Sequence, residues 1–231
     1  EENGTWLATW EAAGGIRLER PMHLAVGPDG LLYVPLYLAD RIAVLTPEGT
    51  LVRSWGSSGS QPGAFDAPAR VAVASDGTVY VADFNNHRVQ VFGETGAFLR
   101  SWGQKGHERG AFHYPTDVAI GTDGSLYVAD AYNHRVQRFS PDGTWLSAWG
   151  GPVARGIKGP LRSWFNVATA VTVTPEGSVY VADFYNHRVQ LFAPDGRWRG
   201  MWGRHGTGSG QFERPTDMAI DEAGRVYVVD W

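Results

Sequence analysis

The chain has 231 residues, of which 43% are hydrophobic and 19% are charged, with a formal net charge of −4. This composition excludes an intrinsically disordered chain, because it supplies ample apolar material for a folded core. There is no cysteine, which excludes disulfides and cysteine metal sites and leaves the compartment open.

No apolar stretch reaches the roughly 18 residues that a membrane-spanning helix needs. The first residues, 1–4, carry neither an initiator methionine nor a signal-peptide pattern. We therefore expect no membrane segment in this chain and a place within a larger polypeptide.

Internal repeats organise the chain from end to end. A Tyr-Val step recurs at spacings of 47, 47, 53 and 47 residues, beginning at Tyr33, Tyr80, Tyr127, Tyr180 and Tyr227. Prolines and tryptophans keep the same frame, at Pro21, Pro68, Pro115 and Pro215 and at Trp55, Trp102, Trp149 and Trp202. A regular period of this length is typical of repeat architectures.

The repeat frame predicts one domain, 1–231, that is incomplete at both ends. Its units cover about 5–10 (partial), 21–56, 68–103, 115–150, 168–203 and 215–231 (partial). The first segment reads as the outermost strand of a unit only, and the last as the first two strands of another. Only the connection 150–164 is longer than its counterparts, by six residues.

Each unit divides into four β-rich runs separated by turn residues. In the second unit these are 71–73, 79–82, 88–92 and 98–102, with an Asp76-Gly77 turn after the first and a Gly96 turn after the third. Helical periodicity is absent. Because a small four-stranded sheet has two apolar faces, several must pack face to face around an axis. The prediction is an all-β fold, a β-propeller of four-stranded antiparallel blades.

The segment 80–92, Tyr-Val-Ala-Asp-Phe-Asn-Asn-His-Arg-Val-Gln-Val-Phe, resembles the core of an NHL repeat. Asn-His-Arg-Val-Gln recurs at 133–137 and 186–190, and the stretch 102–115 resembles the family's connection between blades. The resemblance implies a propeller, commonly six-bladed, whose first strands line a central channel. We therefore expect a fragment of a six-bladed ring; in a five-bladed ring only one strand would be missing.

A polar triplet recurs after the second run of three units. Its members are Asp83, Asn86 and His87, then Asp130, Asn133 and His134, then Asp183, Asn186 and His187. Ligands of one metal must lie within a few ångström of a point, whereas these triplets fall one to a blade, so we predict structural networks and no metal site. Leu36, Ala39 and Asp40 replace all three in the first unit, which suggests one local network that is kept or lost as a set.

Functional residues are expected where the units differ, because a ligand on the axis meets one side chain from each blade. Two residues after each proline, or after Ala168 in its place, the units carry His23, Arg70, Asp117, Ala170 and Asp217. We predict that His23, Arg70, Asp117 and Asp217 form a polar ligand-binding site at one mouth of the channel. The alternative is that they only solvate the channel and pair with one another.

The loops on the same face carry aromatic side chains, which suit recognition of a partner. The predicted interaction face contains Tyr37, Phe84, Tyr132, Trp164 and Tyr185, with Phe184 and Trp231 nearby. Packing against neighbouring loops is the alternative for each of them.

Basic residues of these loops raise the possibility of RNA binding, a function that the resemblance implies for some NHL propellers. They are Lys105, Arg109, Arg155, Lys158, Arg162, Arg204 and Arg214. The acidic net charge argues against a nucleic-acid partner, because phosphate binding depends on clustered positive charge.

An enzymatic alternative follows from lyases that are similar to this repeat, in which zinc-binding histidines follow the prolines. The residues here are Met22, Ala69, Thr116, Thr169 and Thr216, so the zinc site is not predicted. A lyase or hydrolase would instead use His23 or a carboxylate at the channel mouth as base. The leading prediction is a binding or protein-interaction module that acts through the channel-mouth face, without a cofactor and with an unknown protein or small-molecule partner.

Overall fold

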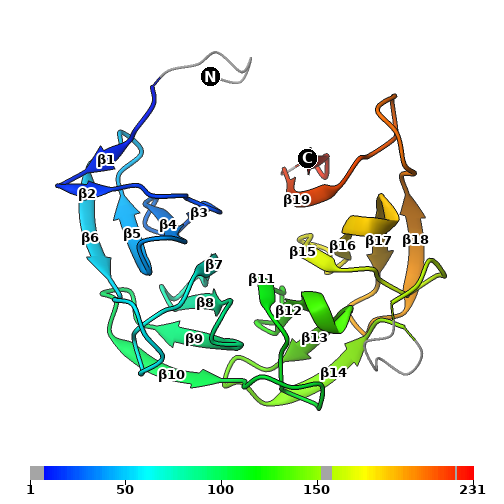
Figure 1. Cartoon of the computed structure of the whole chain (residues 1–231), viewed down its shortest axis with the longest axis horizontal. Coiled ribbons are helices and arrows are strands. Elements are labelled where there is room, and N and C mark those ends of the chain that lie inside the picture. Colours follow the sequence, from blue (N-terminus) through cyan, green and yellow to red (C-terminus); the bar gives the residue numbers. More distant parts are fainter. Residues whose placement is uncertain (1–7, 152–157, 222) are drawn as a thin grey trace.

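The computed structural model describes residues 8–151, 158–221 and 223–231, and the fold is all-β, as predicted. Four four-stranded antiparallel sheets, which we number as blades 1 to 4, follow one another along an arc (Figure 1), and a two-stranded sheet, blade 5, comes after them. No described helix is long and apolar enough to cross a membrane.

The blades have the following strands. Blade 1 contains β3 (Ala25–Val26), β4 (Leu32–Leu36), β5 (Arg41–Leu45) and β6 (Leu51–Trp55); blade 2 contains β7 (Pro68–Val73), β8 (Val79–Asp83), β9 (Arg88–Phe92) and β10 (Phe98–Trp102). Blade 3 contains β11 (Pro115–Ile120), β12 (Leu126–Asp130), β13 (Arg135–Phe139) and β14 (Trp145–Trp149), with the short helix η1 (Ala131–Asn133). Blade 4 contains β15 (Ala168–Val173), β16 (Val179–Asp183), β17 (Arg188–Phe192) and β18 (Trp198–Trp202), with η3 (Phe184–Asn186); blade 5 contains β19 (Pro215–Ile220) and β20 (Val226–Asp230).

The start of the chain differs from the prediction of an outermost strand at 5–10. Residues 1–7 lie outside the described part, and residues 8–10 form no strand. A short hairpin follows instead, made of β1 (Ala12–Ala13) and β2 (Ile16–Arg17). Trp10 nevertheless packs on Gly49 of blade 1, as Trp55 packs on Gly96 of blade 2. The recurrent tryptophans therefore cover a glycine turn of the following blade.

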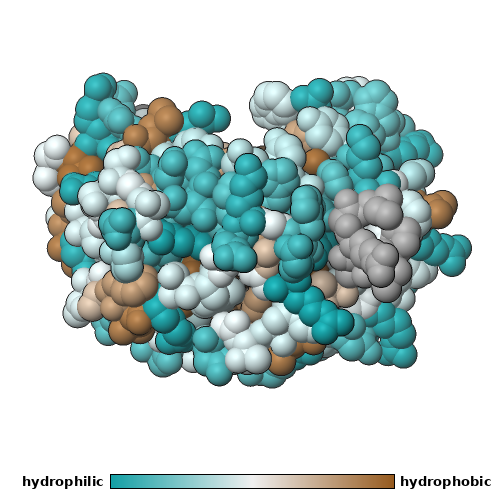
Figure 2. Space-filling model, turned by 60° about the horizontal axis from the view of Figure 1, so that its bottom comes forward, coloured by the Kyte–Doolittle hydropathy of each residue, from teal (hydrophilic) through white to brown (hydrophobic). Residues whose placement is uncertain are grey.

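The apolar core lies between successive blades. One cluster joins Tyr33 and Ile42 of blade 1 to Val71 and Val81 of blade 2, and equivalent clusters join blade 2 to blade 3 and blade 3 to blade 4. The second and third strands of blades 2 to 4 are almost entirely buried, whereas the outer strands are partly exposed. Figure 2 shows the outer side, where separated apolar patches interrupt a largely hydrophilic surface. Face-to-face packing thus covers the apolar faces that a single blade leaves open.

A β-bulge opens the innermost strand of blades 2 to 5. In β7, Pro68 pairs with Asp83 and Arg70 with Ala82, so that Ala69 is an extra residue without an opposite partner. Thr116, Thr169 and Thr216 have the same place in β11, β15 and β19. Because a bulge redirects the side chains on either side of it, it determines which residues face the concave side of the arc.

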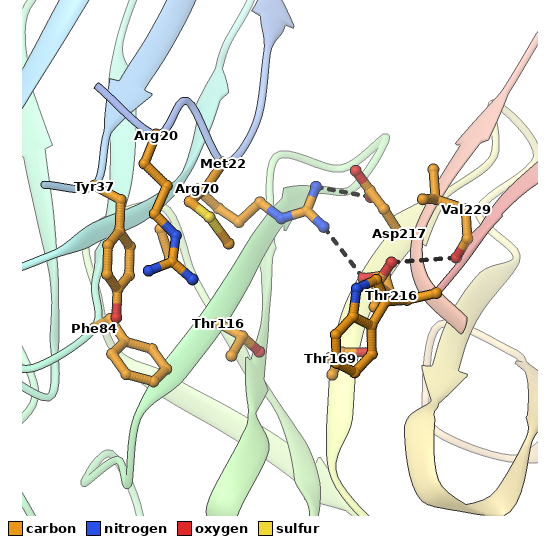
Figure 3. Close-up of a pocket in the computed structure, with 12 residues that line it drawn as sticks. Arg20, Met22, Tyr37, Arg70, Phe84, Thr116, Thr169, Thr216, Asp217 and Val229 are labelled. Atoms are coloured by element: carbon orange, nitrogen blue, oxygen red, sulfur yellow. Dashed lines mark hydrogen bonds and ion pairs between the residues drawn. The ribbon is translucent and has the colours of Figure 1, made fainter. Parts of the chain in front are cut away.

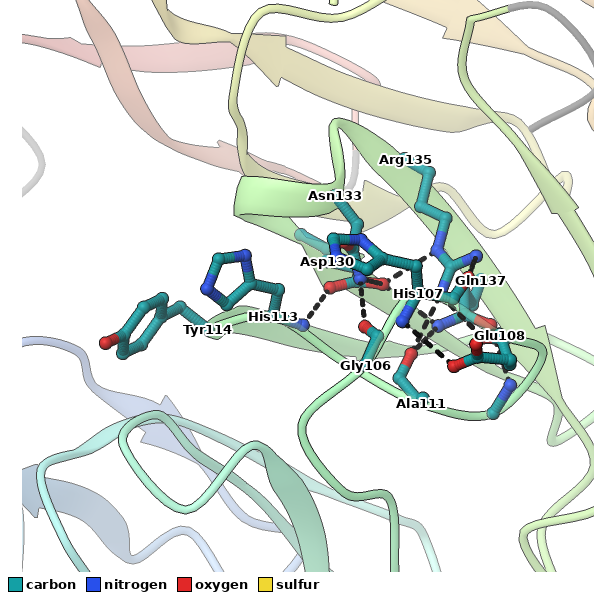
Figure 4. A network of polar contacts seen from close by, with 12 residues as sticks. Gly106, His107, Glu108, Ala111, His113, Tyr114, Asp130, Asn133, Arg135 and Gln137 are labelled. Atoms are coloured by element: carbon teal, nitrogen blue, oxygen red, sulfur yellow. Dashed lines mark hydrogen bonds and ion pairs between the residues drawn. The ribbon is translucent and has the colours of Figure 1, made fainter. Parts of the chain in front are cut away.

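A buried carboxylate joins the second and third strands of blades 2 to 4 to the loop that enters the blade (Figure 4). Asp130 accepts hydrogen bonds from Asn133 Nδ2 (2.8 Å), Arg135 Nε (2.7 Å), Gln137 Nε2 (3.1 Å) and the backbone N–H of His113 (2.7 Å). Asp83 and Asp183 are bonded in the same way in their blades. Burial raises the pKa of all three carboxyl groups, and these donors oppose that effect.

The histidine of each triplet does not belong to this network, so the prediction of one local set was wrong. His87 Nδ1 accepts the backbone N–H of Tyr114 (3.1 Å) and His134 Nδ1 accepts that of Val167 (3.0 Å), each just before the following blade. His187 Nδ1 instead contacts the carbonyl oxygen of Glu213. The histidines of blades 2 and 3 therefore form latches between blades.

Asp40 of blade 1 forms the same latch, which explains why it replaces a histidine. Its carboxylate accepts the backbone N–H of Ala67 (2.8 Å), the counterpart of Tyr114. Asp40 and His87 both have left-handed backbones, with φ of 50° and 54°, a conformation that aspartate and histidine tolerate better than most residues. The latch is thus kept in blade 1 although the carboxylate network is lost.

Blade 1 also has the shortest inner strand of the four complete blades. Pro35 occupies the place that Ala82 has in blade 2, opposite His23. Proline has no N–H to donate to the ladder, and β3 covers only Ala25–Val26. His23 consequently lies before the strand.

We predict that replacing both latch histidines, His87→Asp and His134→Asp, weakens the dependence of stability on pH. Burial lowers the pKa of His87 and His134 below 6.5. The unfolded chain then binds more protons, so stability falls as the pH decreases from 7.5 through 6.5 towards the folded-state pKa. Each latch is expected to contribute about 1 kcal/mol.

Urea unfolding at pH 7.5 and 5.5 measures this effect. The control is His205→Gln, at an exposed histidine that forms no latch. An equal loss of stability on acidification in the double variant and the unaltered chain would contradict the assignment.

Candidate functional site

A cavity of about 600 Å³ opens at the face that carries the loops after β4 and β8. Residues of blades 1 to 5 line it, namely Arg20, Met22, Tyr37, Ala69, Arg70, Phe84, Thr116, Thr169, Thr216, Asp217, Val229 and Trp231. We call it the channel-mouth cavity. Four of these residues are the bulge residues of the inner strands, so the bulges form its wall.

Arg70 crosses the cavity from blade 2 to blade 5 (Figure 3). Its NH1 lies 2.7 Å from Asp217 Oδ1, and its NH2 donates to the carbonyl oxygen of Thr216 at 3.4 Å. Nε lies 3.8 Å from Asp117 Oδ1 of blade 3. Arg70 is 7% exposed as a whole residue, so one buried cation connects three blades.

Asp117 lies beneath the cavity wall. Its Oδ1 accepts the N–H of Val118 and its Oδ2 that of Val171 in blade 4, both at 2.8 Å. Burial raises the pKa of Asp117 to about 6, although Arg70 and the two N–H groups favour the ionised form. The carboxylate therefore holds β11 against β15.

His23 completes the group that the sequence predicted. Burial, and secondarily the positive charge of Arg70, lower the pKa of His23 to about 4, while Asp217 opposes the shift. Its Nδ1 is buried and has no hydrogen-bond partner in the described part of the chain. At neutral pH the ring is thus uncharged and retains an unused nitrogen. The structure brings His23, Arg70, Asp117 and Asp217 together; ligand binding by them stays a prediction.

The threonine hydroxyls of the wall form hydrogen bonds with backbone carbonyl oxygens. Thr116 Oγ1 lies 3.3 Å from the carbonyl oxygen of Ala168, Thr169 Oγ1 donates to Pro215 at 3.1 Å, and Thr216 Oγ1 to Val229 at 3.2 Å. A hydroxyl that donates its proton in this way offers only its acceptor capacity to a ligand. The wall is therefore mildly polar. The bonds of Thr116 and Thr169 join neighbouring inner strands, and that of Thr216 joins the two strands of blade 5.

The predicted interaction face divides into three environments. Tyr37 and Phe84 line the cavity, with ring centroids 6.1 Å apart. Tyr132 and Tyr185 are about half exposed, at 52% and 50%. Trp164 covers Gly159 within its own loop, so this tryptophan packs locally.

Among the described residues, no contact joins the basic loop residues to one another in a common patch. Arg109 lies over Trp145 and Arg162 over Trp198, each on an outer strand, whereas Arg214 lies over Trp231. Arg155 falls outside the described residues. No group of three or more acidic or histidine side chains in the described part is arranged to hold a metal ion.

Sequence reasoning missed three features of the site. Arg20 was not selected, although it lines the cavity, with its Cζ 5.1 Å from the centroid of Tyr37. The residues after the prolines were considered only as missing histidines, yet they form the wall. Gln90, Gln137 and Gln190 are fully buried members of the carboxylate networks. Their recurrence in Arg-Val-Gln was the available signal.

Replacing the central cation, Arg70→Met, should destabilise the fold by about 3–5 kcal/mol at pH 7, because it leaves the buried Asp117 without its counter-charge. The loss should be smaller at pH 5, where the carboxyl group of Asp117 takes up a proton. Urea unfolding at the two pH values tests this.

The matched control is Arg53→Met, which breaks a partly exposed pair with Asp29 (3.4 Å) and should cost about 1 kcal/mol or less. Equal losses for the two variants would show that Arg70 does not balance a buried charge.

Known proteins resemble this chain in its repeats and in its fold. The family model described as NHL repeat matches residues 65–92, 112–139 and 165–192. No curated protein matched the chain in sequence.

Solved structures resemble the fold at low sequence identity. A catalytically inactive virginiamycin B lyase from Staphylococcus aureus with quinupristin has a TM-score of 0.66 at 16% identity, over 92% of this chain and 64% of that one. Hydrazine synthase of Kuenenia stuttgartiensis has a TM-score of 0.67 at 14% identity, over 98% and 59%. A gluconolactonase from Xanthomonas campestris has a TM-score of 0.64 at 15% identity, over 90% and 68%.

The chain spans less than two thirds of the lyase and hydrazine synthase chains that it resembles. At these identities the likeness concerns the fold alone. The three matched segments are NHL repeats, and together with the four-stranded blades and their propeller neighbours they show a propeller-type fold that contains NHL repeats.

Proposed function

We propose that this NHL-repeat chain is a binding module whose ligand, or a side chain of whose partner, enters the channel-mouth cavity. The observation that carries the proposal is the cavity of about 600 Å³ to which blades 1 to 5 all contribute. Ligand sites are commonly concave and mostly apolar, with a few polar groups that orient the ligand. Arg70 and Asp217 supply such groups here.

The rigidity of the wall supports this proposal. Thr116 and Thr169 are fixed by hydrogen bonds between inner strands, and Arg70 connects blades 2, 3 and 5. A wall that is already ordered loses little entropy when a ligand binds.

The exposed aromatics extend the proposed binding face beyond the cavity. Tyr132 contacts Tyr114, and Tyr185 contacts Phe184, in edge-to-face arrangements with centroids 5.3 and 4.7 Å apart. In each pair the second ring therefore packs against the exposed tyrosine. A protein partner larger than the cavity would contact these rings, since tyrosine offers a large contact area at a small entropic cost.

Filling the cavity tests the proposal. Met22→Trp places a larger side chain at a residue that lines the cavity and is 44% exposed, so that the fold should tolerate it. Small organic fragments that bind the unaltered chain, detected by ligand-observed NMR, should lose their signal with this variant.

Leu24→Trp is the matched control, because Leu24 is 47% exposed in the same blade and does not line the cavity. Fragments should still bind to it. The proposal fails if fragments bind both variants equally, or if none binds the unaltered chain.

A second candidate is an enzyme, a lyase or hydrolase, acting at the same cavity. The observation in its favour is His23, whose uncharged ring has a buried Nδ1 without a hydrogen-bond partner in the described part of the chain and whose pKa is influenced by the charges of Arg70 and Asp217. His23 follows the lining residue Met22 and does not itself line the cavity, so this role requires a substrate that reaches past the lining. A neutral imidazole is able to accept a proton from a bound substrate. Virginiamycin B lyase and a gluconolactonase are among the proteins with this fold.

This alternative predicts turnover of quinupristin or of a gluconolactone, followed by chromatography, and its loss on substitution of His23. His23→Gln should lower the rate by about 100-fold, a typical contribution of a general base. With a pKa of about 4, His23 predicts a rate that is constant from pH 7 to pH 5 and falls below that range.

Leu24→Gln is the control, since it introduces the same side chain one residue away. The assignment of His23 as base fails if both variants retain the rate of the unaltered chain.

A further inference from the structure

Two arginines stack on aromatic rings at equivalent positions of the repeat. Arg20 precedes the inner-strand proline of blade 1, and Arg214 precedes that of blade 5. Their rings, Tyr37 and Trp231, likewise occupy one repeat position, after the second strand. Cζ lies 5.1 Å from the centroid of Tyr37 in the first pair and 5.0 Å from that of Trp231 in the second.

The same position carries no cation in the blades between. There it holds Ala67, Tyr114 and Val167. Arg20, Tyr37 and Trp231 line the channel-mouth cavity, and Arg214, which does not line it, lies over the ring of Trp231. Positive charge is thus placed at the cavity rim by blades 1 and 5.

Neither rim arginine forms an ion pair with a described acidic residue, in contrast to Arg70, which pairs with Asp117 and Asp217. Arg20 is exposed, and Figure 3 shows its guanidinium beside the ring of Tyr37. Stacking engages the face of a guanidinium and leaves the N–H donors of its edge free. Those donors match a carboxylate, which accepts two parallel hydrogen bonds.

The interior of the cavity, in contrast to the positively charged rim, is mostly apolar, and its described lining residues carry no unpaired charge. Met22, Ala69, Phe84 and Val229 are apolar, and the threonine hydroxyls already donate to backbone carbonyls. The floor cation, Arg70, is neutralised by two carboxylates. An anionic group is therefore favoured at the rim and an apolar group inside.

A cationic ligand would be disfavoured at the cavity rim. The faces of Tyr37 and Trp231, which attract cations, are already occupied by Arg20 and Arg214. A second cation at the same rings would be repelled by these charges.

We infer that the channel-mouth cavity takes a small organic carboxylate with an apolar body. The carboxylate pairs with Arg20 at the rim, and the body lies against Phe84 and the bulge residues. This inference rests on the proposed function, whose cavity-filling test is independent of charge.

Naphthalene-2-carboxylate and its uncharged counterpart 2-naphthamide are suitable probes, because they share one ring system. Isothermal titration calorimetry at low salt measures their dissociation constants for the unaltered chain and for Arg20→Met, Arg214→Met and Arg17→Met. Arg17 is the control, since its side chain is 84% exposed and belongs to β2, away from the cavity lining.

The carboxylate should bind about tenfold more tightly than the amide, and Arg20→Met should remove most of this difference, as expected for a charge-assisted hydrogen bond. Arg214→Met should weaken the carboxylate less, because Arg214 does not line the cavity. Arg17→Met should leave both constants unchanged, and no arginine variant should affect the amide.

Equal affinity for the two probes overturns the inference, as does an equal effect of Arg17→Met and Arg20→Met. If the amide or other neutral fragments bind the unaltered chain and no longer bind the Met22→Trp variant, the proposed function stands and only the ligand class is wrong. If no fragment of any charge responds to Met22→Trp, both fail.

Discussion

A carboxylate buried between the second and third strands determines how the loops of the mouth face are arranged. Asp130 is completely buried, and such a group is tolerated only when donors surround it. Arg135 meets this need with Nε and uses its other nitrogens to bind the carbonyl oxygens of His107, Glu108 and Ala111 in the entering loop. Arg135 thus compensates the charge of Asp130 and positions the entering loop at the same time.

Blade 1 shows what happens without this carboxylate. Leu36 replaces the aspartate and is buried, and Arg41 Nε donates instead to the carbonyl oxygen of Gly56. Pro35 shortens the inner strand, so that the segment with Arg20, Met22 and His23 lies outside a regular ladder. The side of the cavity formed by blade 1 therefore differs most from the others, and it carries the rim cation Arg20. The uncharged His23 follows in the same segment, outside the cavity lining.

The bulges convert a repeated backbone into an asymmetric site. The inner strands of blades 2 to 5 each contribute a bulge residue to the cavity, and blades 2 and 5 also contribute the residue that follows it. The side chains at these positions differ from blade to blade. Arg70 opposes Asp117 and Asp217, and Ala170 supplies no charge, so the buried ion cluster is lopsided. A lyase and a gluconolactonase share this fold, and a shared fold does not by itself define a function.

The sequence by itself determined the strand pattern, the repeat frame and the group at the mouth, because alternation, turn residues and period are local properties. It placed Arg70, Asp117 and Asp217 at one level of the channel, and they are in contact. It did not determine that the histidines latch neighbouring blades, because that depends on a left-handed backbone and on the next blade's loop. Nor did it determine the reach of Arg70 to blade 5 or the stacking of Arg20 on Tyr37. These contacts join residues of different strands or blades, and only tertiary packing decides which side chains meet.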